Sequence, residues 1–157
     1  MLTTQYIEGN LMRNAAVALF CIVFISSCSG PMGPISGGAL EGTPVPWPDD
    51  WTFTNSIENV LLQTNPDNPY SVTVWIVVVG NQAYIASASH ETRWAKNISN
   101  DNHIVLSVHG ELIEALANRV TAARIAPQIV KAYLDKYDMD EEEFVEQDGV
   151  LFQIDQP

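Results

Sequence analysis

Basic residues are scarce in this sequence of 157 residues, which has seven Lys and Arg against nineteen Asp and Glu. The formal net charge of −12 argues against nucleic acid as a partner, because phosphate binding needs a basic surface. Two cysteines are too few for a disulfide-rich scaffold. Hydrophobic residues make up 46% of the chain and charged residues only 17%, which argues against a disordered or coiled-coil chain.

Self-sufficient catalytic motifs are also missing from the sequence. It has no Cys and His cluster with zinc spacing, no Walker loop and no Gly-x-Ser-x-Gly elbow. His103 and His109 fall on one face of an expected strand but about 20 Å apart, too far to share an ion. The acidic run at 138–143 lacks the alternating ligands and central glycine of an EF-hand loop. We therefore predict no metal site.

The longest apolar run, Ala15–Ile25, has the character of an export signal. Its eleven residues are fewer than the roughly 20 that a membrane-spanning helix needs, and Arg13 precedes it. The sequence Ile25-Ser26-Ser27-Cys28 that follows resembles the lipobox of bacterial lipoproteins. This resemblance implies that residues 1–28 are a lipoprotein signal peptide and that Cys28 is lipidated; a plain cleaved signal is the alternative. Met12 is an alternative start to Met1.

The likeness to lipoproteins also implies a location. Several acyl chains on Cys28 would hold the protein in a membrane, at about 0.8 kcal/mol for each buried CH₂ group. We therefore expect an exported protein, lipid-anchored to the bacterial cell envelope. Ser29 is not the aspartate that retains some lipoproteins at the inner membrane, which favours the outer membrane in a cell that has one.

Two further regions follow the signal. Residues 29–48 are dense in Gly, Pro and Ser, and we predict that they form a flexible tether. Residues 49–157 form the single folded domain, which is long enough for one core of modest stability.

Alternating and helical hydrophobic patterns predict the elements of this domain. Strands are expected over Tyr70–Val79, Gln82–Ala88, His103–His109, Glu111–Val120 and Val150–Ile154, and helices over Asn55–Gln63, His90–Ile98 and Ala126–Asp138. We predict an α+β fold, a small antiparallel split β-barrel of about five strands with flanking helices.

A candidate anion site lies where the second strand runs into the short helix. Small and hydroxyl residues, including Ser87 and Ser89, are followed by Arg93 and Lys96. Hydroxyl groups, free N–H groups at a helix start and two cations suit a bound phosphate. An ordinary capped helix with cations facing solvent is the alternative.

The run from Ser71 to about Tyr137 resembles the split-barrel flavin-binding superfamily, which includes pyridoxamine-phosphate-oxidase-like proteins and deazaflavin-dependent reductases. The matching pattern is V-x-V-W-I-V-V-V-x-G-x-x-Y-I-x-S, then R-W-x-K-N-I, a strand, Gly110, another strand and finally the Ala-Tyr-x-x-Lys-Tyr sequence that begins at Ala132. The resemblance covers about two-thirds of the folded part.

This resemblance implies a homodimer that binds FMN or a deazaflavin coenzyme in clefts between its subunits. Its phosphate-side residues, carried over by position, are Ser87, Ser89, Arg93 and Lys96. Trp94 and Asn97 would support the same pocket, although Trp94 suits the core equally well.

The sequence departs from the superfamily pattern at two places. Ala86 stands where close relatives carry a basic residue, and Ser89-His90-Glu91 stands where they have a basic, Gly-rich turn. Two functions therefore stay open. The first is a flavin-type oxidoreductase acting on a small molecule of unknown identity. The second is a non-catalytic split-barrel lipoprotein that serves as a binding or scaffold module.

Overall fold

The computed structural model describes residues 30–121, 125–141 and 149–157. The predicted signal peptide, with Cys28, lies outside these residues. Within them the chain forms seven strands, one 3-10 helix and two α-helices. These are β1 Thr43–Pro44, η1 Thr52–Ser56, β2 Asn59–Thr64, β3 Tyr70–Val79, β4 Gln82–Ser87, α2 Arg93–Asn100, β5 His103–Val108, β6 Glu111–Arg119, α3 Ala126–Tyr137 and β7 Val150–Asp155.

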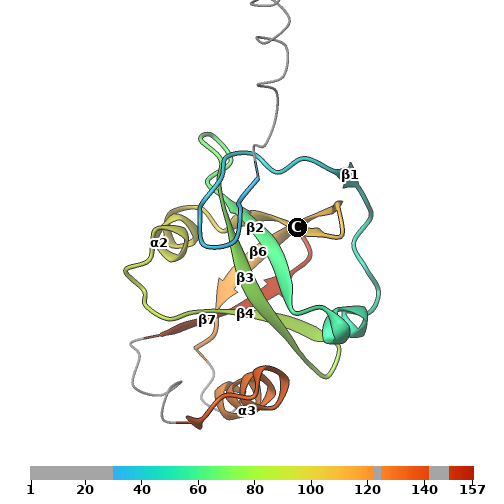
Figure 1. The fold of residues 1–157 in the computed structure, drawn as a ribbon, viewed down its shortest axis with the longest axis vertical. Helices are drawn as coiled ribbons and strands as arrows, with labels where there is room; N and C mark the ends of the chain where they lie inside the picture. The colour runs from blue at the N-terminus through green and yellow to red at the C-terminus, as the bar shows by residue number, and fades with distance from the viewer. Residues whose placement is uncertain (1–29, 122–124, 142–148) are drawn as a thin grey trace, which may run out of the picture.

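Six strands close into an antiparallel barrel in the order β6-β5-β2-β3-β4-β7, because β7 also pairs with β6 (Figure 1). The short β1 pairs in parallel with the first two residues of β6, with Thr43 opposite Glu111. The two α-helices lie on different sides of the barrel (Figure 1). The predicted α+β split barrel with flanking helices is therefore confirmed.

The helix predicted over Asn55–Gln63 is wrong, because most of this segment is strand β2. Its buried residues alternate as Val60, Leu62 and Thr64, which is the strand period. β2 pairs on one side with β3 and on the other with β5, so the barrel has six strands instead of about five. Pairing with β3 and β5 outweighs the local helical pattern.

The segment predicted as a flexible tether differs from that prediction over residues 37–45, which pack against the barrel. Gly37 and Ser71 exchange two backbone hydrogen bonds of 2.9 Å. The Leu40 side chain is buried, and its N–H donates to the Gln63 side chain at 2.7 Å. Backbone groups of β3 and β6 offer hydrogen bonds that a Gly- and Pro-rich chain can accept without a large apolar face of its own.

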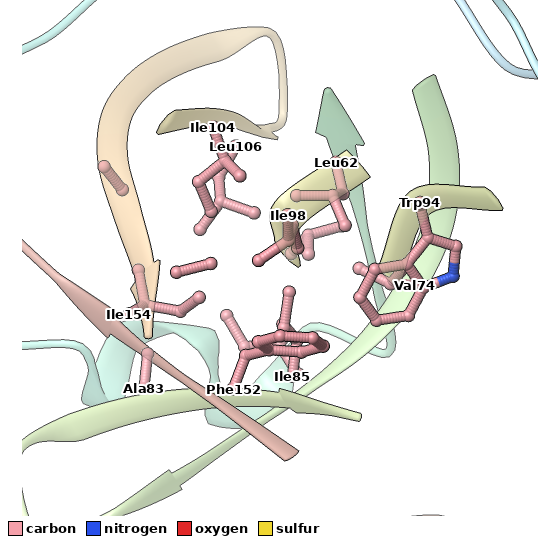
Figure 2. Close-up of a cluster of buried hydrophobic side chains, with 14 of the residues drawn as sticks. Leu62, Val74, Ala83, Ile85, Trp94, Ile98, Ile104, Leu106, Phe152 and Ile154 are labelled. Atoms are coloured by element: carbon pink, nitrogen blue, oxygen red, sulfur yellow. The ribbon is translucent and has the colours of Figure 1, made fainter. Parts of the chain in front are cut away.

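The barrel interior holds the larger of two hydrophobic cores. Side chains from strands on all sides point toward one another, and α2 adds Trp94 and Ile98 (Figure 2). The rings of Trp94 and Phe152 meet with their centroids 5.7 Å apart. The short helix α2 is thereby fixed against the barrel by its apolar face.

A second core lies between the outer surface of the barrel and α3. It is built on Val77 and Tyr84, which are cross-strand partners, and on Ile129 and Tyr133 of α3. β3 is thus buried on both faces in its second half, as its change from a polar to an apolar outer face predicts. This outer face with α3 sets up the cavity described next.

Candidate functional site

A cavity of about 620 Å³ opens beside α3, on the outer face of the barrel. Its walls combine aromatic, small and hydroxyl-bearing side chains from several elements. They are Asn59, Thr73, Val74, Trp75, Ala86, Ser87, Ala88, Thr92, Trp94, Val130, Tyr133, Met139, Gly149, Val150 and Leu151. A volume of this size lies within the range of roughly 300–1,000 Å³ that small-molecule sites occupy.

Three aromatic rings are stacked at one wall of this cavity. Trp75 is 40% exposed and stacks on Tyr137, with ring centroids 4.4 Å apart and 13° between the planes. Tyr137 in turn stacks on Tyr133 at 5.8 Å and 22°. Trp75 and Tyr133 both line the cavity. The stack therefore presents a fixed aromatic surface that a planar ligand can contact.

Hydrogen bonds to the backbone of β3 hold the Tyr137 end of this stack. The Tyr137 hydroxyl accepts from the Ile76 N–H at 2.9 Å and lies 2.8 Å from the Glu58 carbonyl oxygen, to which it donates. Burial raises the pKa of Tyr137 to about 12. The ammonium of Lys136 donates to the carbonyl oxygens of Thr54 at 2.9 Å and Ile76 at 2.7 Å, and burial lowers its pKa.

Tyr133 is the buried end of the same stack. Its hydroxyl lies 3.3 Å from the Tyr84 carbonyl oxygen and 3.4 Å from that of Trp75. Burial raises the pKa of Tyr133 well above its ordinary value, so the phenol stays protonated at neutral pH.

Hydroxyl groups also line the cavity, where the loop between β4 and α2 contributes to its wall. The Ser87 hydroxyl lies 2.7 Å from the Thr92 hydroxyl and donates to the Ser89 carbonyl oxygen at 2.8 Å. Thr92 also donates to this carbonyl, at 3.1 Å. The two hydroxyls therefore fold the loop between β4 and α2 back on itself and keep uncharged oxygen atoms at the cavity wall.

Two of the six predicted binding residues, Ser87 and Trp94, line the cavity. Trp94 also contributes to the barrel core, as the alternative for it expected, while its role toward a cofactor stays a prediction. Ser89 does not line the cavity, and its hydroxyl accepts the Glu91 N–H at 3.1 Å. The Asn97 amide points to another part of the barrel, where it donates to the Thr64 hydroxyl at 2.9 Å.

The two predicted phosphate cations, Arg93 and Lys96, are exposed and are not part of the cavity wall. The Arg93 guanidinium lies 4.2 Å above the centre of the Tyr70 ring. The Lys96 ammonium pairs with the Glu91 carboxylate at 2.5 Å, and this pairing holds the pKa of Glu91 below its usual range. The structure therefore brings the predicted hydroxyl and indole groups together but directs the cations elsewhere.

Sequence reasoning did not identify Trp75 and Tyr133 as site residues. One signal was present in the sequence: Tyr133 and Tyr137 are four residues apart on the apolar stripe of α3, so they share one helix face. Trp75 lies on the outer face of β3 between Thr73 and Val77, where a large aromatic side chain needs a partner. Which element supplies that partner depends on where α3 packs.

In the described part of the chain, no three His, Cys, Asp or Glu side chains are grouped so that they could hold a metal ion. Residues 30–121, 125–141 and 149–157 likewise include no helix with the length and hydropathy needed to cross a bilayer.

No protein-family model and no curated protein matches the sequence. Among solved structures, the chain is similar to HutZ, the heme storage protein from Vibrio cholerae, with a TM-score of 0.56. Identity is 16%, and the match covers 67% of this chain and 85% of that one. It is also similar to protein Rv2991 from Mycobacterium tuberculosis, with a TM-score of 0.53 and 18% identity over 65% of this chain and 74% of that one.

Protein Atu2129 from Agrobacterium tumefaciens is similar as well, with a TM-score of 0.53 and 18% identity over 62% of this chain. The present chain spans only 47% of that protein's length. At these identities the likeness establishes the fold and leaves the chemistry to the site. The chain therefore has the split-barrel fold to which its sequence pattern pointed.

Proposed function

We propose that this protein binds a flavin-type cofactor, with the planar ring system in the cavity beside α3. The observation that carries the proposal is the aromatic wall, where Trp75 is stacked on Tyr137 and keeps an exposed face. Tyr133 lies on the same wall. A flavin ring is flat and aromatic, and offset stacking on such rings contributes about 0.5–1.5 kcal/mol for each pair.

The cavity residues fit one part of such a cofactor well. Aromatic rings and the aliphatic Val130 and Leu151 suit the ring system, and the hydroxyls of Thr73, Ser87 and Thr92 suit a polar side chain. A bound flavin would supply hydride transfer, and the protein would supply position and surroundings. In this role α3 holds the ring wall, and the loop between β4 and α2 contributes hydroxyl groups.

Replacing Trp75 tests this proposal. We expect Trp75→Ala to weaken flavin binding about tenfold, because it removes one stacking surface worth about 0.5–1.5 kcal/mol. Binding is measured by titrating riboflavin and FMN with the purified full chain and following the quenching of flavin fluorescence.

Phe53 provides the matched control, since it is an exposed aromatic side chain that stacks on Trp51 at 5.8 Å and does not line the cavity. Phe53→Ala should leave flavin affinity within a factor of two. Trp75→Phe, which keeps an aromatic face, should recover most of the affinity. Equal losses for Phe53→Ala and Trp75→Ala would count against the cavity as the site.

One observation favours the second candidate, a non-catalytic binding or scaffold module. Among the described residues that line the cavity, Tyr133 alone has a side chain that titrates, and its pKa is raised well above neutral. The described walls thus offer no acid or base for a substrate near pH 7. Cofactor binding without turnover of any substrate, in the presence of a chemical reductant, would favour this alternative.

We further propose that the protein is exported and anchored to the cell envelope through lipid on Cys28. The lipobox-like sequence before Cys28 supports this location. Cys28→Ala should move the protein from the membrane fraction to the soluble fraction of a bacterial host, and it should abolish incorporation of labelled fatty acid. A chain that stays in the membrane fraction after this replacement would contradict the lipid anchor.

The protein is also proposed to act as a homodimer, as its resemblance to split-barrel proteins implies. Met32 and Ile35 are exposed large apolar side chains of the kind that interfaces cover. Light scattering at micromolar concentration should give twice the mass of one chain, and a monomer at all concentrations would contradict the proposal.

A further inference from the structure

The positive charges of the described chain are not part of the wall of the cavity beside α3. None of the five described Lys and Arg residues belongs to its wall, and four of them already have partners. Arg93 lies over Tyr70, Lys96 pairs with Glu91, Lys131 pairs with Asp135 at 2.8 Å, and Lys136 donates to the carbonyls of Thr54 and Ile76; Arg119 is exposed on β6.

Charged residues of both signs flank the lining residues in the sequence. Arg93 lies between Thr92 and Trp94, and Lys131 follows Val130, but their charged groups lie over Tyr70 and against Asp135. Asp140 and Glu141 are exposed and directly follow the lining residue Met139. Glu91 precedes the lining residue Thr92, and its charge is held by Lys96 at 2.5 Å. A phosphate group carries about −1.5 to −2 charges at pH 7, and among the described residues no Lys or Arg on the cavity wall would compensate them.

The polar groups on the wall are uncharged. They are the hydroxyls of Thr73, Ser87 and Thr92 and the amide of Asn59. Such groups donate to and accept from the hydroxyls of a sugar-alcohol chain, which are uncharged as well. Phosphate sites depend on charge-assisted hydrogen bonds, which are roughly twice as strong as neutral ones. The part of the wall that the structure describes therefore has the donors for a ribityl chain but lacks charged donors for its phosphate ester.

From this arrangement we infer that the cavity selects an unphosphorylated flavin of the riboflavin class and discriminates against FMN and other phosphate-bearing flavins. The inference rests on the proposed flavin site and specifies its ligand. Ring contacts with Trp75 and Tyr133 are common to both flavins, so the discrimination comes from the phosphate alone. Electrostatic repulsion of this kind weakens when salt screens the charges.

The test compares riboflavin and FMN as titrants of the purified full chain, with flavin fluorescence as the readout. At low ionic strength we expect riboflavin to bind about tenfold more tightly than FMN, which corresponds to little more than one close pair of like charges in water. Added salt should narrow this ratio, because screening acts on the phosphate and not on the ring. FMN binding that equals or exceeds riboflavin binding would overturn the inference.

Ala88 allows the missing charge to be supplied. It lines the cavity and is exposed, so a long side chain is accommodated there. Ala88→Arg should raise the ratio of the FMN affinity to the riboflavin affinity about tenfold, because it adds a charge-assisted partner for the phosphate only. Ala88→Gln, similar in length but uncharged, is the matched control, and it should leave the ratio of the FMN affinity to the riboflavin affinity unchanged.

Two outcomes separate this inference from the proposed function. Arg93→Ala should leave the ratio of the two affinities unchanged; a selective loss of FMN binding would show that Arg93 serves a phosphate and would overturn the inference alone. The absence of binding by either flavin at millimolar concentration would refute the proposed flavin site and the inference with it.

Discussion

Tyr137 contributes to both the stability of the barrel and the shape of the cavity. Its ring supports Trp75 from behind, and its hydroxyl bonds the backbone of Ile76 and the carbonyl of Glu58. Burial removes the water that would stabilise a phenolate, and the negative charge of Glu58 also disfavours it. The buried position therefore favours the protonated form, and its pKa rises to about 12.

This shift predicts how stability responds to alkaline pH. The folded state holds the Tyr137 proton up to about pH 12, whereas the unfolded chain releases it near the ordinary value of 10.0. The unfolded state therefore loses protons first, and the stabilisation present below pH 10 is lost as the pH rises toward 12. Urea unfolding midpoints measured at pH 8, 10 and 11 should fall over this interval.

Tyr137→Phe is the informative variant for that prediction. It lowers stability at pH 8, because the Ile76 N–H loses its partner, but it should make the decline above pH 10 less steep. Part of the decline remains, since burial also raises the pKa values of Tyr84 and Tyr133. An unchanged slope in Tyr137→Phe would contradict the assignment.

At the scale of elements, α3 forms both the outer core and one wall of the cavity. Ile129 is fully buried in the smaller core, one turn before Tyr133. A change that destabilises α3 at Ile129 would therefore also displace Tyr133, which lines the cavity from the same helix. Stability and ligand binding are coupled in this helix.

Ile129→Ala tests this coupling. It should lower the free energy of unfolding by about 2–5 kcal/mol, the usual cost of truncating a fully buried Ile or Leu. Flavin affinity should fall as well, because Tyr133 loses support from the preceding turn. Gln128→Ala, an exposed position in the same helix, should leave both quantities unchanged in urea unfolding and in the titration.

Elements were predictable from the sequence where the local pattern and the barrel agreed. The strand Tyr70–Val79, its turn and the helix from Ala126 were predicted closely, because alternation and the proline at the helix start coincide with their final surroundings. β2 was missed because Ile57, Val60 and Leu61 fit a helix face equally well. Its strand conformation depends on pairing with β3 and β5, the two strands on either side of it in the barrel.

The site was predictable only in part, for a related reason. The hydroxyls and Trp94 follow β4 in sequence, so their place at its end was foreseeable. The directions of the Arg93 and Lys96 side chains were not foreseeable. Each depends on one partner, Tyr70 for Arg93 and Glu91 for Lys96, and sequence spacing does not show these contacts. The aromatic wall depends on where α3 docks, and no local pattern specifies that.

At the scale of the whole molecule, the segment that precedes the barrel forms hydrogen bonds with two parts of it. Thr43 and Val45 donate to the carbonyl oxygens of Gly110 and Leu112 at 2.8 and 2.9 Å, and Gly37 pairs with Ser71. Gly42 passes so close to Gly110 that an added Cβ would lie 2.2 Å from its carbonyl oxygen. The segment therefore lies directly against the barrel, with no space for a side chain at Gly42.

A chain that begins at Pro48 should accordingly be less stable than one that begins at Gly30. It loses four backbone–backbone hydrogen bonds along residues 37–45, the hydrogen bond from the Leu40 N–H to the Gln63 side chain, and the burial of Leu40. Each hydrogen bond has a net value of about 0.5–1.5 kcal/mol. We expect a loss of roughly 3 kcal/mol or more in the free energy of unfolding by urea. Equal midpoints for the two chains would show that residues 30–47 are a passive tether.

The pairing of Gly37 with Ser71 also has a mechanical consequence. A pull applied to the chain on the N-terminal side of Gly30 reaches the barrel first through these two backbone hydrogen bonds, and then through those at Thr43 and Val45. The segment 37–45 would peel away in steps before any barrel strand bears load. Stretching from this end should thus show small early ruptures ahead of the main unfolding event. The N-terminal segment would therefore dissipate part of an applied force before the folded domain bears it.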